Sequence, residues 1–292
     1  GDLSGRVCGF RCGERRFAMK KKTVLCTVLA AVMVLALCLV IFLFNGFLQN
    51  RILFEAIEAN DYENARTAIK CGAFLEMPRH LVAVPEIVMT NPTPLIAACK
   101  EGNQDIVALL LDHGADINKR DNCTGQTPLL AALHGSKQNR FSLAFYLIEN
   151  GADFHIQQRT NSALQETLFV SENDSEQTVS EGYLLFRYLL EHNADKTIPL
   201  PWESTLTHAA HYRNYNAVRY LLENGYFTVD ERDPRGNTAL IVAAQNNQIE
   251  IAQLLLDRGA SKSITDGSGK TAYDYAAEKG YEEIARLLRP EQ

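Results

Sequence analysis

The chain has 292 residues, of which 46% are hydrophobic and 22% are charged, and it carries a formal net charge of −6. This acidic balance disfavours a nucleic-acid-binding protein, because affinity for the phosphate backbone comes mainly from lysine and arginine. Of the seven cysteines only three follow residue 50, and this odd number argues against a disulfide-stapled extracellular scaffold.

The first 22 residues form a basic tail with seven lysines or arginines and two acidic residues, a net charge of +5. Within this tail, Met19 is followed at once by three lysines. This indicates a second candidate start, which would make residues 1–18 an upstream extension. Cys8 and Cys12 lack a second ligand pair nearby, so the sequence favours a disordered tail over a metal or redox site.

An apolar segment follows at residues 23–44, where TVLCTVLAAVMVLALCLVIFLF runs for 22 residues without a charge. That length is sufficient to cross the hydrocarbon core of a bilayer as a helix. Fourteen of the residues are Val, Leu, Ile or Phe, and they favour insertion by about 4–8 kcal/mol. We predict a single transmembrane helix that acts as a signal anchor.

Three other interpretations of this segment are weaker. A cleaved signal peptide would have a shorter apolar run and a small-x-small cleavage site, which NGFLQN at residues 45–50 does not provide. Lipidation at Cys38 would need a smaller residue before it than Leu37. A buried helix of a soluble domain has no place in the repeated pattern that follows.

Beyond the apolar segment the chain repeats itself. The stretch LLLDHGADIN at residues 109–118 returns in similar form from residues 67, 146, 188, 220 and 254. A second pattern, TPLIAA from residue 93, returns in step with it from residues 127, 204, 238 and 271. The spacing of about 33 residues, with occasional insertions, is typical of a stacked repeat array.

In these two motifs the chain resembles the ankyrin-repeat family, whose TPLHxA and GAD signatures they nearly reproduce over about residues 51–292. The resemblance implies an all-α ankyrin-repeat solenoid, in which each unit is a helix, a turn, a second helix and a projecting loop. About seven units are expected, near residues 51–76, 93–118, 127–155, 162–197, 204–230, 238–263 and 271–292.

The residue types support these units independently of the family. Thr93 can cap a helix, and Pro94 suits the first helical position because its missing N–H would have no partner there. Gly114 is expected to end the second helix in the left-handed conformation, which also explains Asn193 at the equivalent position. Arg286 and Arg289 give the last unit a polar outer side, as the end of a solenoid needs.

Insertions interrupt the stack at residues 77–92, at residues 135–140 and at residues 169–182. The last of these, FVSENDSEQTVSEG, is acidic and hydroxyl-rich and is predicted to be a mobile surface loop. Cys71 and Cys99 fall at helix positions that usually hold small apolar residues, so both are predicted to pack in the core.

The charge distribution predicts the topology. Residues 51–292 hold 22 basic and 33 acidic residues, a net charge of −11, against +5 in the tail. Positively charged flanks stay in the cytoplasm. The N-terminus is therefore expected to be cytoplasmic and the repeats extracytoplasmic.

No pattern in the sequence indicates catalysis. The chain lacks a Gly-rich phosphate loop, a nucleophile elbow and an HExxH motif. His208 and His211 stand three residues apart on one expected helix, but no further ligand completes a metal site near them. We therefore expect no catalytic residue, no metal and no cofactor.

The resemblance implies recognition of a protein partner in a groove formed by the loops and the first helices. Tyr212 beside Tyr215 is the best candidate anchor, because tyrosine is enriched among the residues that dominate binding energy. The net charge of −11 favours a basic partner. The other candidate groove residues are Lys100, Glu101, Lys119, Arg120, Asp121, His134, His211, Arg232, Asp233, Arg235, Gln245, Asn246, Glu278 and Lys279.

Taken together, these patterns predict a membrane-tethered, non-catalytic protein–protein interaction module, such as a scaffold or adaptor. An inhibitor or immunity-type protein that binds and neutralises a toxin or an enzyme is the alternative. The oligomeric state stays open.

Overall fold

A computed structural model describes residues 4–78, 92–134, 139–156, 158, 162–169, 175–194 and 204–290. These residues form fourteen α-helices, and no strand occurs within them. In chain order the helices are α1 (Ser4–Ala59), α2 (Tyr62–Lys70), α3 (Pro94–Glu101), α4 (Gln104–Asp112), α5 (Pro128–His134), α6 (Arg140–Glu149), α7 (Ala163–Glu166), α8 (Glu176–Glu191), α9 (Thr205–His211), α10 (Tyr215–Glu223), α11 (Ala239–Gln245), α12 (Ile249–Asp257), α13 (Ala272–Glu278) and α14 (Glu282–Leu288).

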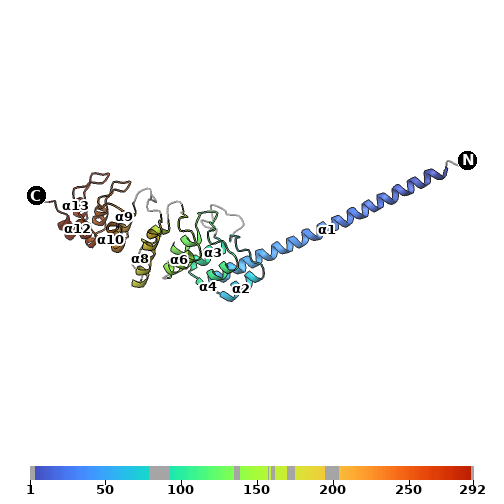
Figure 1. Cartoon of the computed structure of the whole chain (residues 1–292), viewed down its shortest axis with the longest axis horizontal. Coiled ribbons are helices and arrows are strands. Elements are labelled where there is room, and N and C mark those ends of the chain that lie inside the picture. The colour runs from blue at the N-terminus through green and yellow to red at the C-terminus, as the bar shows by residue number, and fades with distance from the viewer. Residues whose placement is uncertain are drawn as a thin grey trace.

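The helices form a row of antiparallel pairs with two layers. The first helices of the pairs contact one another, as α3 does with α1 and α5, and the second helices form a layer of their own, as α12 does with α10 and α14. The connecting loops project to one side of the row, and α1 extends far beyond the end of the row that holds the first repeat (Figure 1). The predicted all-α solenoid is confirmed.

Caps of the predicted kind define the helices. The Thr93 side chain accepts a hydrogen bond from the Ile96 N–H at 3.4 Å, and Pro94 occupies the first turn of α3. Gly114 adopts a φ of 89° after α4, and Asn193 adopts a φ of 62° after α8. Both positions lie in the left-handed region, where glycine and asparagine cost the least.

Hydrogen bonds from side chains tie three of the units to the unit before them. The side-chain amide of Asn103 donates to the Ile57 carbonyl at 2.8 Å, and that of Asn139 donates to the Gly102 carbonyl at 2.9 Å. Gln248 repeats the contact with the His211 carbonyl at 3.3 Å. Each bond satisfies a carbonyl at the end of a first helix, which has no partner within that helix.

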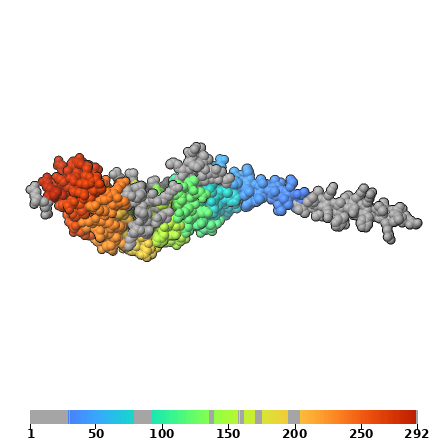
Figure 2. Space-filling model, turned by 90° about the horizontal axis from the view of Figure 1, so that it is seen from above, coloured from blue at the N-terminus to red at the C-terminus, as the bar shows by residue number. Residues whose placement is uncertain are grey.

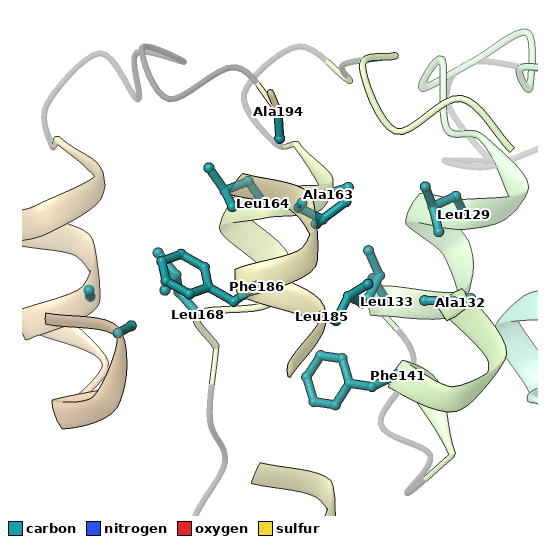
Figure 3. Packing of buried hydrophobic residues seen from close by; sticks show 14 of the residues in the cluster. Leu129, Ala132, Leu133, Phe141, Ala163, Leu164, Leu168, Leu185, Phe186 and Ala194 are labelled. Atoms are coloured by element: carbon teal, nitrogen blue, oxygen red, sulfur yellow. The ribbon is translucent and has the colours of Figure 1, made fainter. Parts of the chain in front are cut away.

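The core is a continuous apolar layer between the two rows of helices. Figure 3 shows its middle, where Leu133 and Phe141 of one pair lie near Leu185 of the next, while Phe186 points the other way and lies beside Leu168. Phe141 and Phe186 are at most 1% exposed. Because each unit buries its apolar face against its neighbours, no unit is expected to be stable alone.

The insertion at residues 169–182 is not entirely a surface loop, and that prediction is wrong for its second half. Residues 176–182 form the first turns of α8, which Ser175 caps by accepting from the Thr178 N–H at 3.1 Å. Thr178 and Gly182 are buried. The small Gly182 lies against the Phe141 ring, and this contact fixes the helix. Residues 170–174 lie outside the described residues, as do most residues of the other two insertions.

The cysteine predictions have different outcomes. Cys99 is 1% exposed in α3, and burial raises the pKa of its thiol. Cys71 is instead exposed, because it forms the C-terminal cap of α2 rather than part of the buried helix face. The prediction for Cys71 is therefore wrong.

The apolar segment and the first helix of the first repeat form one continuous helix. α1 continues through residues 23–44 without a break and buries Leu53, Ala56 and Ile57 in the stack. Its stretch Ala31–Ala59 is long and apolar enough to cross a membrane, and large apolar side chains from Val32 to Leu48 are exposed on it. The sequence predicted these two parts with separate bounds, but no turn separates them.

Candidate protein-binding surface

The projecting loops and the C-terminal ends of the first helices form one candidate surface, which contacts such as that of Lys270 Nζ with the Glu278 carboxylate at 2.7 Å hold together. We call it the loop-side surface. Figure 2 shows the molecule from above relative to Figure 1, and in that view the units follow one another in chain order. The candidate groove residues come from these two sets of positions.

Each of two projecting loops is closed by an aspartate that faces inward. The Asp121 carboxylate accepts from the N–H groups of Cys123 and Thr124 at 2.7 and 2.6 Å. Asp233 accepts from the N–H groups of Arg235 and Asn237, each at 2.8 Å. The two aspartates are only 4% and 5% exposed. They hold the turns together, so their side chains are not available to a partner.

Asp266 closes the following loop in the same way. Its carboxylate accepts from the Tyr275 hydroxyl and from the N–H groups of Ser268 and Lys270. Burial alone would raise the pKa of Asp266, but these hydrogen bonds outweigh it and lower the pKa to about 2. The loop therefore keeps its shape across the neutral pH range.

Adjacent loops also support one another. The Gly267 N–H donates to the Arg235 carbonyl at 3.0 Å, and a Cβ on Gly236 would lie 2.9 Å from the Gly267 nitrogen. Arg232 donates from Nη2 to the Thr265 carbonyl at 3.0 Å. The loops after α10 and α12 are therefore a rigid pair that can present side chains in a fixed arrangement.

The remaining candidates differ in exposure. The loop tips expose a basic set, and the helix ends expose residues of both signs, while Glu101, Gln245 and Asn246 are half-buried. Asn246 donates to the carbonyl of its own helix at Val242, and Lys279 donates to the Gln245 carbonyl. The exposed members are Lys100, Lys119, Arg120, His134, His211, Arg232, Arg235, Glu278 and Lys279.

An aromatic cluster lies on this surface between the fourth and fifth units. The Tyr212 ring, at the end of α9, packs edge-on against Phe169 at 5.1 Å and against His208 at 4.7 Å. His211 lies at 5.1 Å from the same ring. Phe169 is 46% exposed although it is a large apolar side chain. We call these four residues the aromatic cluster.

Phe169 was not among the sequence candidates. It becomes exposed because α7 has only four residues, so the chain leaves the first-helix layer one turn earlier than in α5. The buried Arg140 holds this exit by donating from Nη2 to the Phe169 carbonyl at 3.2 Å. The apolar Phe-Val pair that begins the otherwise acidic insertion is the signal that could have found it.

Tyr215 does not join the cluster through any ring contact within the described residues. It opens α10, the second helix of its pair, and is 37% exposed there. The sequence placed it beside Tyr212, but the turn at Arg213, with a φ of 58°, separates the two helices. Tyr212 is therefore the anchor candidate, and Tyr215 is a comparison residue.

The ends of α5 and α7 are joined by an ion pair on the same surface. His134 Nε2 lies 3.1 Å from a Glu166 carboxylate oxygen, and its Nδ1 lies 2.9 Å from the Leu130 carbonyl. When Nδ1 donates to that carbonyl, only a protonated ring can also donate from Nε2. The hydrogen bond to Glu166 raises the pKa of His134 against the opposing effect of burial.

This pair predicts a pH-dependent contribution to stability. Because the pKa of His134 is raised in the folded state, the contribution is fully present below the ordinary histidine value of about 6.5. It is lost as the pH rises through the raised value. The free energy of unfolding of the His134→Gln variant should therefore be furthest below that of the wild type near pH 6. The difference should be less than about 1 kcal/mol, because the pair is partly exposed. Urea unfolding at several pH values measures the difference. Glu166→Gln should show the same trend, and a gap independent of pH in both variants would contradict it.

The comparisons with known proteins agree with this architecture. A model of ankyrin repeats (three copies) matches residues 53–158 and 176–266. The ankyrin repeat protein YahD of Escherichia coli (strain K12) is 32% identical over 203 residues, which cover 68% of this chain and 94% of that protein. The ankyrin repeat and KH domain-containing protein mask-1 of Caenorhabditis elegans is 31% identical over 228 residues, which cover 74% of this chain but only 8% of mask-1.

A solved structure shows the same fold. The crystal structure of the human ASB11 ankyrin repeat domain superposes with a TM-score of 0.63 at 25% identity. The match covers 82% of this chain and 98% of that domain. The repeated motifs, the paired helices and these matches agree, and the chain belongs to the ankyrin-repeat family.

Proposed function

We propose that this chain is a membrane-tethered, non-catalytic adaptor that holds a protein partner on its loop-side surface. Ankyrin repeats form protein-interaction modules, and the fold alone names no partner. The observation that carries the proposal is the aromatic cluster, where exposed Phe169 packs against Tyr212 at 5.1 Å. Exposed rings next to polar groups are typical of the centre of a protein interface.

The surroundings of the cluster support this role. The loops on the same surface are held by buried aspartates and by contacts between neighbours, so binding would require little ordering of the backbone. His134 is already fixed to Glu166 on the adjacent helix end. A preorganised surface with a central aromatic anchor suits a folded partner or a short ordered segment.

Charge supports a basic partner. The repeats carry a net charge of −11, which attracts a basic protein over distances of about a Debye length, roughly 10 Å at 0.1 M salt. The exposed tips at Lys119, Arg120, Arg232 and Arg235 are themselves basic, so they would meet carbonyl or acidic groups of the same partner, away from its basic region. Association is expected to weaken as salt is added.

The binding proposal predicts a separation between affinity and stability. With the full chain in detergent as bait, Tyr212→Ala should weaken capture of the retained partner by about 30-fold, which corresponds to a hot-spot loss of about 2 kcal/mol. Phe169→Ala and Arg232→Ala should weaken it less, and none should lower the melting temperature appreciably.

Tyr215→Ala is the matched control and should capture the partner as the wild type does. If the Tyr212, Phe169 and Arg232 variants bind normally while a change within residues 170–174 abolishes capture, the loop-side surface is not the binding site. If mixing instead abolishes the catalytic activity of the retained protein, the chain is an inhibitor rather than an adaptor.

The membrane tether is the second part of the proposal. Residues 23–44 carry no charge, and the described large side chains of this part of α1 are exposed, as in Leu35 at 69% and Phe44 at 71%. A bilayer would remove this apolar surface from water. The tail charge of +5 supports a cytoplasmic N-terminus and extracytoplasmic repeats.

Thiol labelling tests this topology. On intact cells, an impermeant maleimide should label the chain at Cys71, which is exposed, and at Cys123, which is half-buried. Burial leaves Cys99 unreactive. Cys8→Ser combined with Cys12→Ser should retain the label, whereas Cys71→Ser combined with Cys123→Ser should lose it. The reverse pattern would place the repeats in the cytoplasm.

A further inference from the structure

The segment after α2 packs along α1 rather than along the repeats alone. We call residues 71–78 the Phe74 loop. Its Phe74 ring lies 6.2 Å from the Phe42 ring and 6.0 Å from the Phe47 ring, both edge-on. Phe42 belongs to the apolar part of α1, and Phe47 lies just after that part. The loop therefore covers the place where the predicted membrane span ends.

Gly46 provides the space for this ring. A Cβ at Gly46 would lie 2.2 Å from Cε2 of Phe74, a distance that no real Cβ contact shows. Two amide side chains hold the loop on either side of the niche. Asn45 donates to the Cys71 carbonyl at 2.9 Å, and Asn50 donates to the Met77 carbonyl at 3.5 Å. The loop is thus fixed at a defined height on α1.

That height can be compared with the thickness of a bilayer. Phe42 lies inside the span 23–44, whereas Phe47 lies beyond it. At about 1.5 Å per residue the two are about 7.5 Å apart along the helix axis. The polar interfacial layer on each side of the hydrocarbon core is about 5–8 Å thick. A ring that contacts both residues must lie in that layer if α1 spans the membrane.

The composition of the loop fits such a layer. Phe74, Leu75 and Met77 are only half-buried in the protein. Glu76 is the acidic residue of the loop, and its carboxylate accepts from the Asp116 N–H of the next unit at 2.8 Å. On α1 at the same height, Phe47 and Leu48 remain 39% and 47% exposed. Apolar surface thus continues past residue 44 and onto the loop.

We propose that the Phe74 loop is a second membrane contact, which lies in the interfacial layer of the bilayer that α1 crosses. The bilayer is the partner of this surface. The first repeat would then rest on the membrane, and the unbroken α1 would hold the stack at a fixed inclination to it. This inference rests on the proposed membrane insertion of α1.

Depth-dependent fluorescence quenching tests the contact. The sequence has one tryptophan, Trp202, so Trp202→Phe gives a dark background for single reporters in the full chain. Three reporters are needed: Phe42→Trp in the span, Leu75→Trp in the loop, and Phe169→Trp on the fourth unit. The protein is placed in phosphatidylcholine vesicles whose acyl chains carry bromine near the headgroup end.

The Phe42→Trp and Leu75→Trp reporters should lose comparable fractions of their emission, and the Phe169→Trp reporter should lose none. Quenching of the first without the second would overturn the inference and leave the membrane span intact. An unquenched Phe42→Trp reporter would overturn the proposed insertion itself, and the inference with it.

A substitution at Gly46, which makes room for the Phe74 ring, allows a second quenching measurement. Gly46→Ala, added to the Leu75→Trp reporter, puts a methyl group where the Phe74 ring lies, so the ring must leave. Quenching of that reporter should fall, while quenching of the Phe42→Trp reporter should not change. Val34→Ala, at an exposed position of α1, is the matched control and should alter neither. Unchanged quenching of the Leu75→Trp reporter after Gly46→Ala would contradict the role of Phe74 packing against Gly46 in holding the loop at the membrane.

Discussion

Leu110→Asp is expected to destabilise the repeat stack by roughly 4 kcal/mol or more. Leu110 is fully buried in α4, and its carbonyl accepts from the Ala115 N–H that closes the helix. A carboxylate there would have no cation to pair with among the apolar side chains around it. Urea denaturation followed by circular dichroism measures the loss.

Leu184→Asp is the control for the same chemical change. Leu184 lies on α8 and is 53% exposed. The substitution should change the free energy of unfolding by no more than about 0.5 kcal/mol, as surface changes generally do. Equal losses in the two variants would mean that burial in the stack is not what stabilises α4.

The repeating part of the fold could be predicted because residues within each unit mark where its helices begin and end. Thr93 and Pro94 mark a helix start through chemistry that acts within four residues. Gly114 and Asn193 mark helix ends because the left-handed backbone favours these residue types. Local rules of this kind need no knowledge of the rest of the chain.

The candidate surface could be predicted only in part, because exposure depends on neighbours. Asp121 and Asp233 look like exposed loop tips in the sequence, yet each accepts hydrogen bonds from the N–H groups of its own turn. Phe169 looks like the start of a loop, yet the early end of α7 brings it against Tyr212 from the next unit. No single sequence motif predicts the burial of these aspartates or the position of Phe169.

The continuity of α1 from the apolar segment into the first repeat was not predicted, for a related reason. Asn45 and Gly46 interrupt the apolar run and read as a helix end, since glycine and asparagine are weak helix formers. In the structure the same residues serve a tertiary contact, because Gly46 makes room for Phe74 and Asn45 bonds to the Cys71 carbonyl. Packing overrides local propensity here.

A second glycine in the chain, Gly182, also makes room for an aromatic ring. Gly182→Ala should destabilise the stack by roughly 1–2 kcal/mol, although alanine is the better helix former by about 0.5–1 kcal/mol. A Cβ at Gly182 would lie 2.7 Å from Cε2 of Phe141, and that ring is 1% exposed with no space to retreat. Overpacking therefore outweighs helix propensity, and chemical denaturation shows the sign directly.

A double-mutant cycle separates the steric cause from any general intolerance of α8. Phe141→Leu alone leaves a cavity and should also destabilise the stack. Combined with Gly182→Ala, the smaller side chain makes room for the new methyl group, so the double variant should be more stable than the sum of the single losses predicts, by about 0.5 kcal/mol or more. Ser180→Ala, at an exposed position of the same helix, should be neutral or slightly stabilising. Strict additivity in the cycle would contradict the contact between Gly182 and Phe141, and with it the reason why this part of the acidic insertion is a helix.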